Sequence, residues 1–194
     1  SGPSAALPAF ADTPLGGPGV SPAIGQGAGW RPIQRGEPVV IDMVGSAGGY
    51  LVDQTRILSI GPLPEDMVQG YEICLGAQEV LKQVAVPGAT CGAVYQQVKD
   101  WVEQKVQELG LTAYFMGAPG NQVPYIGHGI GLELDEFPFI TRGSEQTLAA
   151  DQVFACEPKL VFPGRGVVGV ENTWHVTEQG LVPITFSSEA LRVV

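Results

Sequence analysis

The stretch VVIDMVGSAGGYLVDQTR, residues 39–56, decides the fold because it joins two apolar runs through a loop of small residues. Apolar runs bounded by such loops predict β-strands, which we place at 38–44 and 50–60. If SAGG (46–49) forms the loop, Asp42 lies directly opposite Asp53. The stretch therefore predicts an antiparallel hairpin that holds two carboxylates on one face, with their Cβ atoms about 5 Å apart.

A second hairpin of the same kind is predicted near the C-terminus. Two apolar runs flank the turn sequence PGR (163–165), and Glu157 and Glu171 lie at equal distances from that turn. In this register the two glutamates face each other. The chain therefore carries two acidic pairs, each on an apolar hairpin.

Directly opposed carboxylates destabilise a sheet, and their burial is costly unless a cation accompanies them. As the cations nearest the pairs we take Arg56, three residues after Asp53, and Arg165, in the second turn. A divalent metal ion would remove the conflict. The alternative is that the four acids occupy ordinary solvent-facing positions on an exposed sheet.

His128 is a further candidate site residue, because the glycines of GHGIG (127–131) predict an irregular backbone that exposes its imidazole. A lone histidine is usually structural, but beside four carboxylates it becomes a candidate fifth ligand. We interpret the other histidine, His175, as a surface residue of a strand. Imidazole with carboxylates suits Mn, Fe, Co or Zn.

Four carboxylates carry four negative charges, which two divalent cations would balance. Two-metal sites hold their ions about 3.5–4 Å apart and clamp a nucleophilic water and a substrate oxygen. Because the bound water is acidified, hydroxide is available near neutral pH. The five residues therefore predict hydrolase chemistry.

Further along the chain, two helices are predicted at 64–85 and 91–109, the second with Thr90 as its N-cap and a clean apolar stripe. The remaining strands are predicted at 122–126, 130–140 with breaks, 152–160, 166–177 and 181–186. Residues 1–36 hold many glycines and prolines and predict an extended or looped segment. This order of elements predicts an α+β fold, with helices on one face of a mostly antiparallel sheet.

Composition narrows the functional class. The 194 residues include 20 acidic and 10 basic ones, a net charge of −10, and no cluster of Lys and Arg, which argues against nucleic-acid binding. The sequence contains no run of about 20 apolar residues, so we expect no membrane-spanning helix. Three scattered cysteines give no disulfide framework and no cysteine zinc motif, so we expect a reducing, cytoplasmic compartment.

Taken together, these residues resemble the pita-bread metallopeptidases: the Xaa-Pro aminopeptidases, prolidases and methionine aminopeptidases, with creatinase as a relative. The resemblance rests on SGPSAALP (1–8), VVIDMVGSAGGYLVDQTR (39–56), GHGIGLELDE (127–136), FACEP (154–158) and VGVENTWHVTEQG (168–180). It implies a pita-bread fold and two divalent metal ions, foremost Mn, with Co or Zn as alternatives. It favours the Xaa-Pro branch over the methionine branch.

The resemblance also implies a role for each ligand. Asp53 and Glu171 would bridge the two metals, Asp42 would bind one of them, and His128 with Glu157 would bind the other. Glu157 would also be catalytic, moving a proton between the metal-bound hydroxide and the leaving amine. The implied activity is removal of an N-terminal residue from a peptide, with Xaa-Pro as the expected bond.

Three positions depart from the family pattern: Ala9 and Asp135 stand where the family has histidines, and Gly169 where it commonly has arginine. Asp135 either hydrogen-bonds a substrate amine, as a second catalytic residue, or faces solvent. These departures leave two other functions open. One is a binding or scaffold module without turnover, and the other is a related C–N hydrolase with a small non-peptide substrate.

The resemblance further implies a partial catalytic domain spanning 1–194, with the family's first helix pair, and any N-terminal domain, preceding Ser1. We expect a homo-oligomer, or association with that N-terminal part, to cover the sheet face that those helices would otherwise cover. The expected partner is a peptide substrate, with neither nucleic acid nor membrane.

Overall fold

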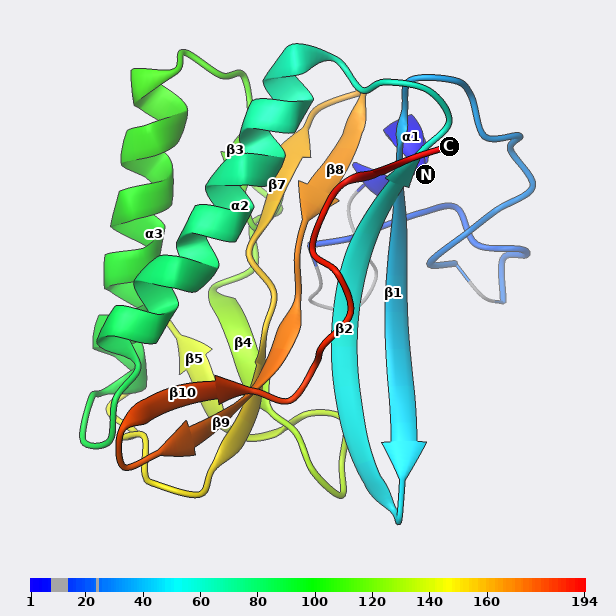
Figure 1. The fold of residues 1–194 in the computed structure, drawn as a ribbon. Helices are drawn as coiled ribbons and strands as arrows, with labels where there is room; N and C mark the ends of the chain where they lie inside the picture. Colours follow the sequence, from blue (N-terminus) through cyan, green and yellow to red (C-terminus); the bar gives the residue numbers. More distant parts are fainter. Residues whose placement is uncertain (8–13, 24) are drawn as a thin grey trace.

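The computed structural model describes residues 1–7, 14–23 and 25–194. Two long helices lie beside a set of short strands, and both ends of the chain lie near one end of the first hairpin (Figure 1). The elements in chain order are α1 Gly2–Ala5, β1 Pro38–Ala47, β2 Tyr50–Ser59, α2 Glu65–Val84, α3 Cys91–Glu108, β3 Tyr114–Phe115, β4 Tyr125–Gly129, β5 Glu136–Thr141, β6 Val153–Cys156, β7 Lys159–Phe162, β8 Gly166–Gly169, β9 Asn172–Thr177, β10 Gly180–Pro183 and β11 Arg192–Val193.

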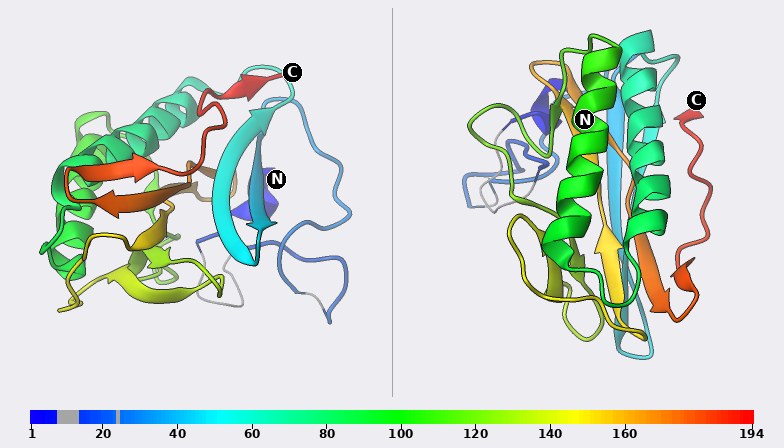
Figure 2. Two further views of the ribbon diagram at one scale, coloured as in Figure 1. Left: turned by 60° about the horizontal axis from the view of Figure 1, so that its bottom comes forward. Right: turned by 90° about the vertical axis from the view of Figure 1, so that its left-hand side faces the viewer.

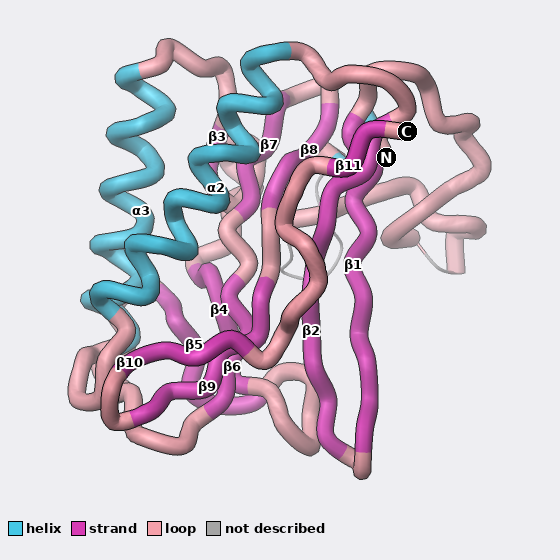
Figure 3. Tube along the Cα trace, in the orientation of Figure 1, coloured by secondary structure: helices cyan, strands magenta, loops and turns pink. Residues whose placement is uncertain are grey.

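The α+β order expected from the sequence is confirmed, with both long helices at their predicted places. The described part of residues 1–36 forms loop apart from α1, as expected (Figure 3). The strands predicted at 152–160 and 166–177 each divide into two, β6 with β7 and β8 with β9. These two breaks matter for the site, because Glu157 and Glu171 lie in them.

The register of the first hairpin differs from the prediction. Asp42 pairs with Thr55, and Asp53 pairs with Val44, so the two aspartates are diagonal neighbours on one face and not directly opposed. The cause is the turn. Gly48 and Gly49 both have positive φ, 61° and 89°, which permits a two-residue turn in place of the expected four-residue loop.

The register of the second hairpin is as predicted. Lys159 pairs with Gly169 and Phe162 with Gly166 across the turn. The ladder ends at the Lys159–Gly169 pair, although the Val170 N–H still donates to the Pro158 carbonyl at 3.4 Å. Glu157 and Glu171 therefore lie directly beyond the end of this hairpin, where the two chains leave it for other partners.

The strands form three ladders, ordered β1-β2-β11, β10-β9-β6-β4-β5 and β3-β7-β8. Helices α2 and α3 pack side by side and cover one face of the strands, as Figure 2 shows from the helix side. The first hairpin lies on the other side of β7 and β8 from the helices (Figure 1). The cleft of the predicted site is lined by residues of the first two ladders together with Glu157 and Glu171.

Helix α3 packs into the core through the apolar stripe that the sequence predicts. Val94, Val98 and Val102 of α3 are fully buried, and the Thr90 hydroxyl caps the helix by accepting a hydrogen bond from the Ala93 N–H. Leu109 follows the last residue of α3 and is half exposed. In the described part of the chain, no helix has the length and apolar character needed to cross a membrane.

Candidate metal centre

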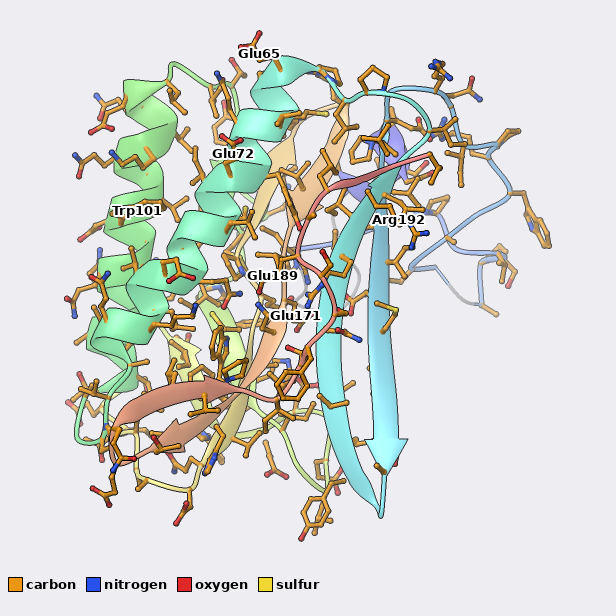
Figure 4. The ribbon with its side chains drawn as sticks, viewed as in Figure 1. Glu65, Glu72, Trp101, Glu171, Glu189 and Arg192 are labelled. Carbon is orange, nitrogen blue, oxygen red and sulfur yellow. The ribbon has the colours of Figure 1, made fainter. Side chains whose placement is uncertain are left out.

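The five predicted ligands line one open cleft of about 810 Å³. They come from five places in the chain: Asp42 from β1, Asp53 from β2, His128 from β4, Glu157 from the break between β6 and β7, and Glu171 from the break between β8 and β9. Figure 4 shows Glu171 between the segment that leaves β8 and the strand β2. The fold thus brings together every residue of the predicted ligand set.

Backbone and hydroxyl contacts fix β2 against the segment that carries Glu171. The Asp53 N–H donates to the Thr173 hydroxyl at 3.0 Å, and that hydroxyl donates to the Asp53 carbonyl at 2.8 Å. The Arg56 guanidinium donates to the Glu171 carbonyl at 2.6 Å, so this arginine supports the backbone of Glu171 and not its carboxylate. The first and second hairpins therefore meet at the site.

Three of the residues form the tightest group. Ligand atoms of Asp53, His128 and Glu171 lie within 4.8 Å of one another, and all three side chains are buried. Asp53 Oδ1 is buried with no hydrogen-bond partner among the described residues. A buried carboxylate oxygen without a partner is costly in a folded protein. A divalent cation fits this group, because it would satisfy that oxygen with two carboxylates and one imidazole.

The orientation of His128 suits a ligand. Its Nδ1 lies 3.1 Å from the Gly129 carbonyl, which favours the tautomer that donates from Nδ1. Its Nε2 then faces the cleft, 4.0 Å from Glu157 Oε1. Metal-binding histidines commonly have their second nitrogen held in this way.

Lys159 is a site residue that the sequence analysis missed. Its side chain is 1% exposed, and its Nζ lies 2.5 Å from Glu157 Oε2, 3.6 Å from Asp42 Oδ2 and 3.8 Å from Glu171 Oε2. The signal was available, because residues two apart on an extended segment share a face, and Lys159 is two residues after Glu157.

The electrostatics reflect this crowding. Burial, and next the Asp42 carboxylate, raise the pKa of Asp53 to about 6. Burial also raises the pKa of Glu171 well above its usual value, against the opposing effect of Lys159. Burial alone would lower the pKa of Lys159, but the carboxylates of Glu157, Glu171 and Asp42 outweigh it and raise that pKa. The cluster has more negative charge than its one ammonium can balance.

The remaining predicted residues fall outside this cluster. Asp135 is 57% exposed at the cleft, with Oδ1 3.4 Å from His128 Nδ1. Arg165, expected near the acidic pairs, instead binds Asp66 of α2 through both terminal guanidinium nitrogens. His175 is a partly exposed residue of β9 beside Asp151, away from the cleft, as predicted. Ala9 lies outside the described residues.

A second hollow, of about 490 Å³, lies between the described N-terminal segment and β1. It shares Gln26 and Asp42 with the metal-site cleft. The two hollows therefore adjoin each other at Asp42, which lines both. The loop segment before β1 contributes to the wall of the site.

Comparison with known proteins agrees with this geometry. The family model for metallopeptidase family M24 matches residues 1–178. The probable dipeptidase PepE of Mycobacterium tuberculosis is 35% identical over 165 residues, which are 84% of this chain and 41% of that protein. The Xaa-Pro dipeptidase of Pyrococcus furiosus is 32% identical over 159 residues, which are 82% of this chain and 42% of that protein.

Among solved structures, the X-Pro aminopeptidase of Thermotoga maritima superposes with a TM-score of 0.76 at 27% identity, covering 88% of this chain and 45% of that one. The expected pita-bread fold is thereby confirmed. The chain spans about two fifths of the length of the curated relatives it matches. A family match over nearly the whole chain, together with the assembled ligand set, shows that this chain belongs to metallopeptidase family M24.

Proposed function

We propose that this chain carries the metal-dependent centre of an exopeptidase that hydrolyses the N-terminal peptide bond of peptides, with proline after that bond. The observation that carries the proposal is the group formed by Asp53, His128 and Glu171, with the unpartnered Asp53 Oδ1 inside an open cleft. The relatives named as Xaa-Pro dipeptidases and an X-Pro aminopeptidase support the choice of bond.

The metal would be held by the carboxylates of Asp53 and Glu171 and by His128 Nε2. Mn is the first candidate, and Co or Zn are alternatives with the same ligand preferences. When bound, a divalent ion supplies a polarised substrate carbonyl and an acidified water. The hydrogen bond from Nδ1 of His128 to the Gly129 carbonyl keeps the imidazole oriented for this role.

Glu157 is the residue proposed to transfer the proton. Its Oε2 is held by Lys159, and its Oε1 faces His128 Nε2 at 4.0 Å, so one carboxylate oxygen remains directed at the reaction zone. A carboxylate in this position can take a proton from an attacking water and pass it to the leaving amine. Asp135, exposed in the same cleft, has the charge to bind the N-terminal ammonium of a peptide.

A binding module without turnover is the second candidate, and Lys159 is the observation that favours it. An ammonium buried among the predicted ligands neutralises part of the charge that would otherwise draw in metal. The expected cytoplasmic location, and association with another copy or with an N-terminal part, stay predictions.

A peptide panel tests the proposal. Hydrolysis of Ala-Pro and Ala-Pro-Ala would be compared with that of Ala-Ala and Ala-Ala-Ala, in added Mn²⁺ and in chelator. We expect turnover only with metal and preference for the proline peptides, and activity on the tripeptide would separate an aminopeptidase from a strict dipeptidase.

Paired histidine variants supply the control. His128→Ala should abolish metal-dependent turnover, whereas His175→Ala should keep it, because His175 lies on β9 away from the cleft. Metal binding with no hydrolysis of any peptide would favour the binding module. Full activity of His128→Ala would exclude the proposed centre.

A further inference from the structure

Lys159 places a positive charge inside the predicted metal centre. Its Nζ is within 4 Å of carboxylate oxygens of Asp42, Glu157 and Glu171, three of the five predicted ligands. The other two, Asp53 and His128, form with Glu171 the group that fits a divalent ion, so that Glu171 belongs to both sets. The cluster therefore divides into one part that an ammonium occupies and one part that it leaves to a metal.

The formal charges agree with one ion. The four carboxylates carry −4, and the ammonium with one divalent ion brings this to −1. A second divalent ion would make the cluster positive, and it would lie among the same oxygens that surround Nζ. Like charges a few ångström apart repel strongly in a buried site, where solvent screens them poorly.

The backbone opposite Lys159 is built to hold its side chain in this position. Gly169 is its partner in the β7–β8 ladder. A Cβ at position 169 would lie 2.5 Å from Cγ of Lys159 and 2.8 Å from the Pro158 carbonyl oxygen. Only glycine leaves this space, so the Lys159 side chain runs over the Gly169 backbone towards the carboxylates.

The Lys159 side chain is also buried. Lys159 is 1% exposed, and its own strand β7 and the neighbouring strand β8 are buried throughout. A buried ammonium needs paired carboxylates, and the described residues offer them only within this cluster. The ammonium is therefore paired within the cluster and not exposed at the surface.

We propose that the Lys159 ammonium is a built-in cation that takes the place of one of the two divalent ions expected from the sequence, so that the centre binds a single divalent ion on Asp53, His128 and Glu171. Asp42 then serves the ammonium and not a metal. This inference rests on the proposed metal-dependent function, but it concerns the number of ions and not the reaction.

Metal counting on the full chain tests it. The metal-free protein would be titrated with Mn²⁺ by calorimetry, and bound Mn per chain would be measured after gel filtration. We expect one ion per chain, with any second site weaker by roughly 100-fold or more. Lys159→Ala should bind two ions of similar affinity, because it frees Asp42, Glu157 and Glu171.

Two further variants keep the result interpretable. Lys99→Ala removes an equal charge from the exposed Lys99–Glu103 pair on α3 and should still bind one ion. Lys159→Met keeps most of the side-chain bulk without its charge, and serves if Lys159→Ala does not fold. Either Lys159 variant should show a larger rise in melting temperature on Mn²⁺ addition than the parent chain, because its carboxylates lack the internal cation.

The outcomes separate the two proposals. Two ions of similar affinity in the parent chain would overturn this inference and leave the metal-dependent function standing. A single ion in both folded Lys159 variants would also overturn it. No bound metal in the parent chain would overturn both.

Discussion

The backbones of Thr55 and Glu171 hydrogen-bond to each other in both directions, at 3.2 and 3.4 Å, and the Thr55 hydroxyl donates to Glu171 Oε2 at 2.7 Å. These hydrogen bonds help to join the first hairpin to the segment that follows the second, and they orient the Glu171 carboxylate. Thr55 is also the residue opposite Asp42 in the β1–β2 ladder. The pair therefore couples the positions of ligands on both hairpins.

Thr55→Val should weaken metal binding while preserving the fold. The substitution removes the hydroxyl that orients Glu171, and loss of such a supporting hydrogen bond typically costs 10-fold to 100-fold in metal affinity. A Mn²⁺ titration measures the change. Thr177→Val is the matched control, because it removes a hydroxyl bonded to the Gly180 carbonyl in the β9–β10 turn. Equal affinities in the two variants would show that Thr55 has no orienting role.

Glu157→Gln should lower kcat by about 10²-fold to 10⁴-fold, the usual contribution of a general base or acid. The amide keeps the shape of the side chain but cannot take a proton. Steady-state kinetics on an Xaa-Pro peptide with saturating Mn²⁺ measure the loss. Glu178→Gln, at an exposed turn position, should leave kcat unchanged. A kcat within two-fold of the parent chain in Glu157→Gln would refute the proton-transfer role.

Asp135→Asn should raise KM more than it lowers kcat, because the carboxylate is proposed to bind the substrate ammonium and lies at the exposed rim of the cleft. Capping the peptide N-terminus by acetylation should remove the difference between the variant and the parent chain. Asp151→Asn offers a close control, since Asp151 lies 3.2 Å from the other histidine, outside the cleft. If Asp135→Asn leaves KM unchanged, Asp135 serves only as a solvent-facing group.

The Asp66–Arg165 ion pair should make stability depend on pH at acid values. The hydrogen bonds from Arg165 hold the pKa of Asp66 below its usual value. A lowered pKa stabilises the folded state fully above the unfolded value near 3.8, and this stabilisation is lost as pH falls through the folded pKa. Asp66→Asn should therefore be less stable by about 0.5–1 kcal/mol at pH 7, and the difference should shrink as pH falls below 3.8 and through the lowered folded-state pKa.

Urea unfolding at several pH values measures this difference. Glu65→Gln removes a neighbouring charge from the same helix start without touching Arg165, and its stability relative to the parent chain should not follow the same pH course. High salt should shrink the Asp66 effect, because both side chains are more than a third exposed. A difference that does not shrink as pH falls well below 3.8 would rule out the ion pair as its source.

Local patterns made much of this molecule predictable from its sequence. The stripe through Val94, Val98 and Val102 has a helical period, and the PGR turn defines its hairpin unambiguously. The predicted register of the first hairpin was wrong, because SAGG allows either a four-residue loop or a two-residue turn at Gly48 and Gly49. Sequence alone does not choose between these, since glycine adopts positive φ without strain.

The ligand residues of the site were predictable, but their division between the Lys159 ammonium and a metal ion was not. Asp42, Asp53, His128, Glu157 and Glu171 could be named from opposed acids and from the resemblance. The proximity of Lys159 to Glu157 was also predictable, but its approach to Asp42 and Glu171 was not, because these oxygens come from separate segments of the chain. The close approach of the Lys159 side chain to the Gly169 backbone is likewise a product of how the second hairpin packs.

The five segments that supply the cleft extend from β1 to the start of β9, so no short piece of the chain contains the centre. An unfolded chain therefore has no such site, and metal can bind only to the assembled state. Binding of this kind adds about 2.7 kcal/mol of stability when free metal is 100 times its Kd. Cellular metal supply would then govern how long the polypeptide survives proteolysis, independently of any peptide it cleaves.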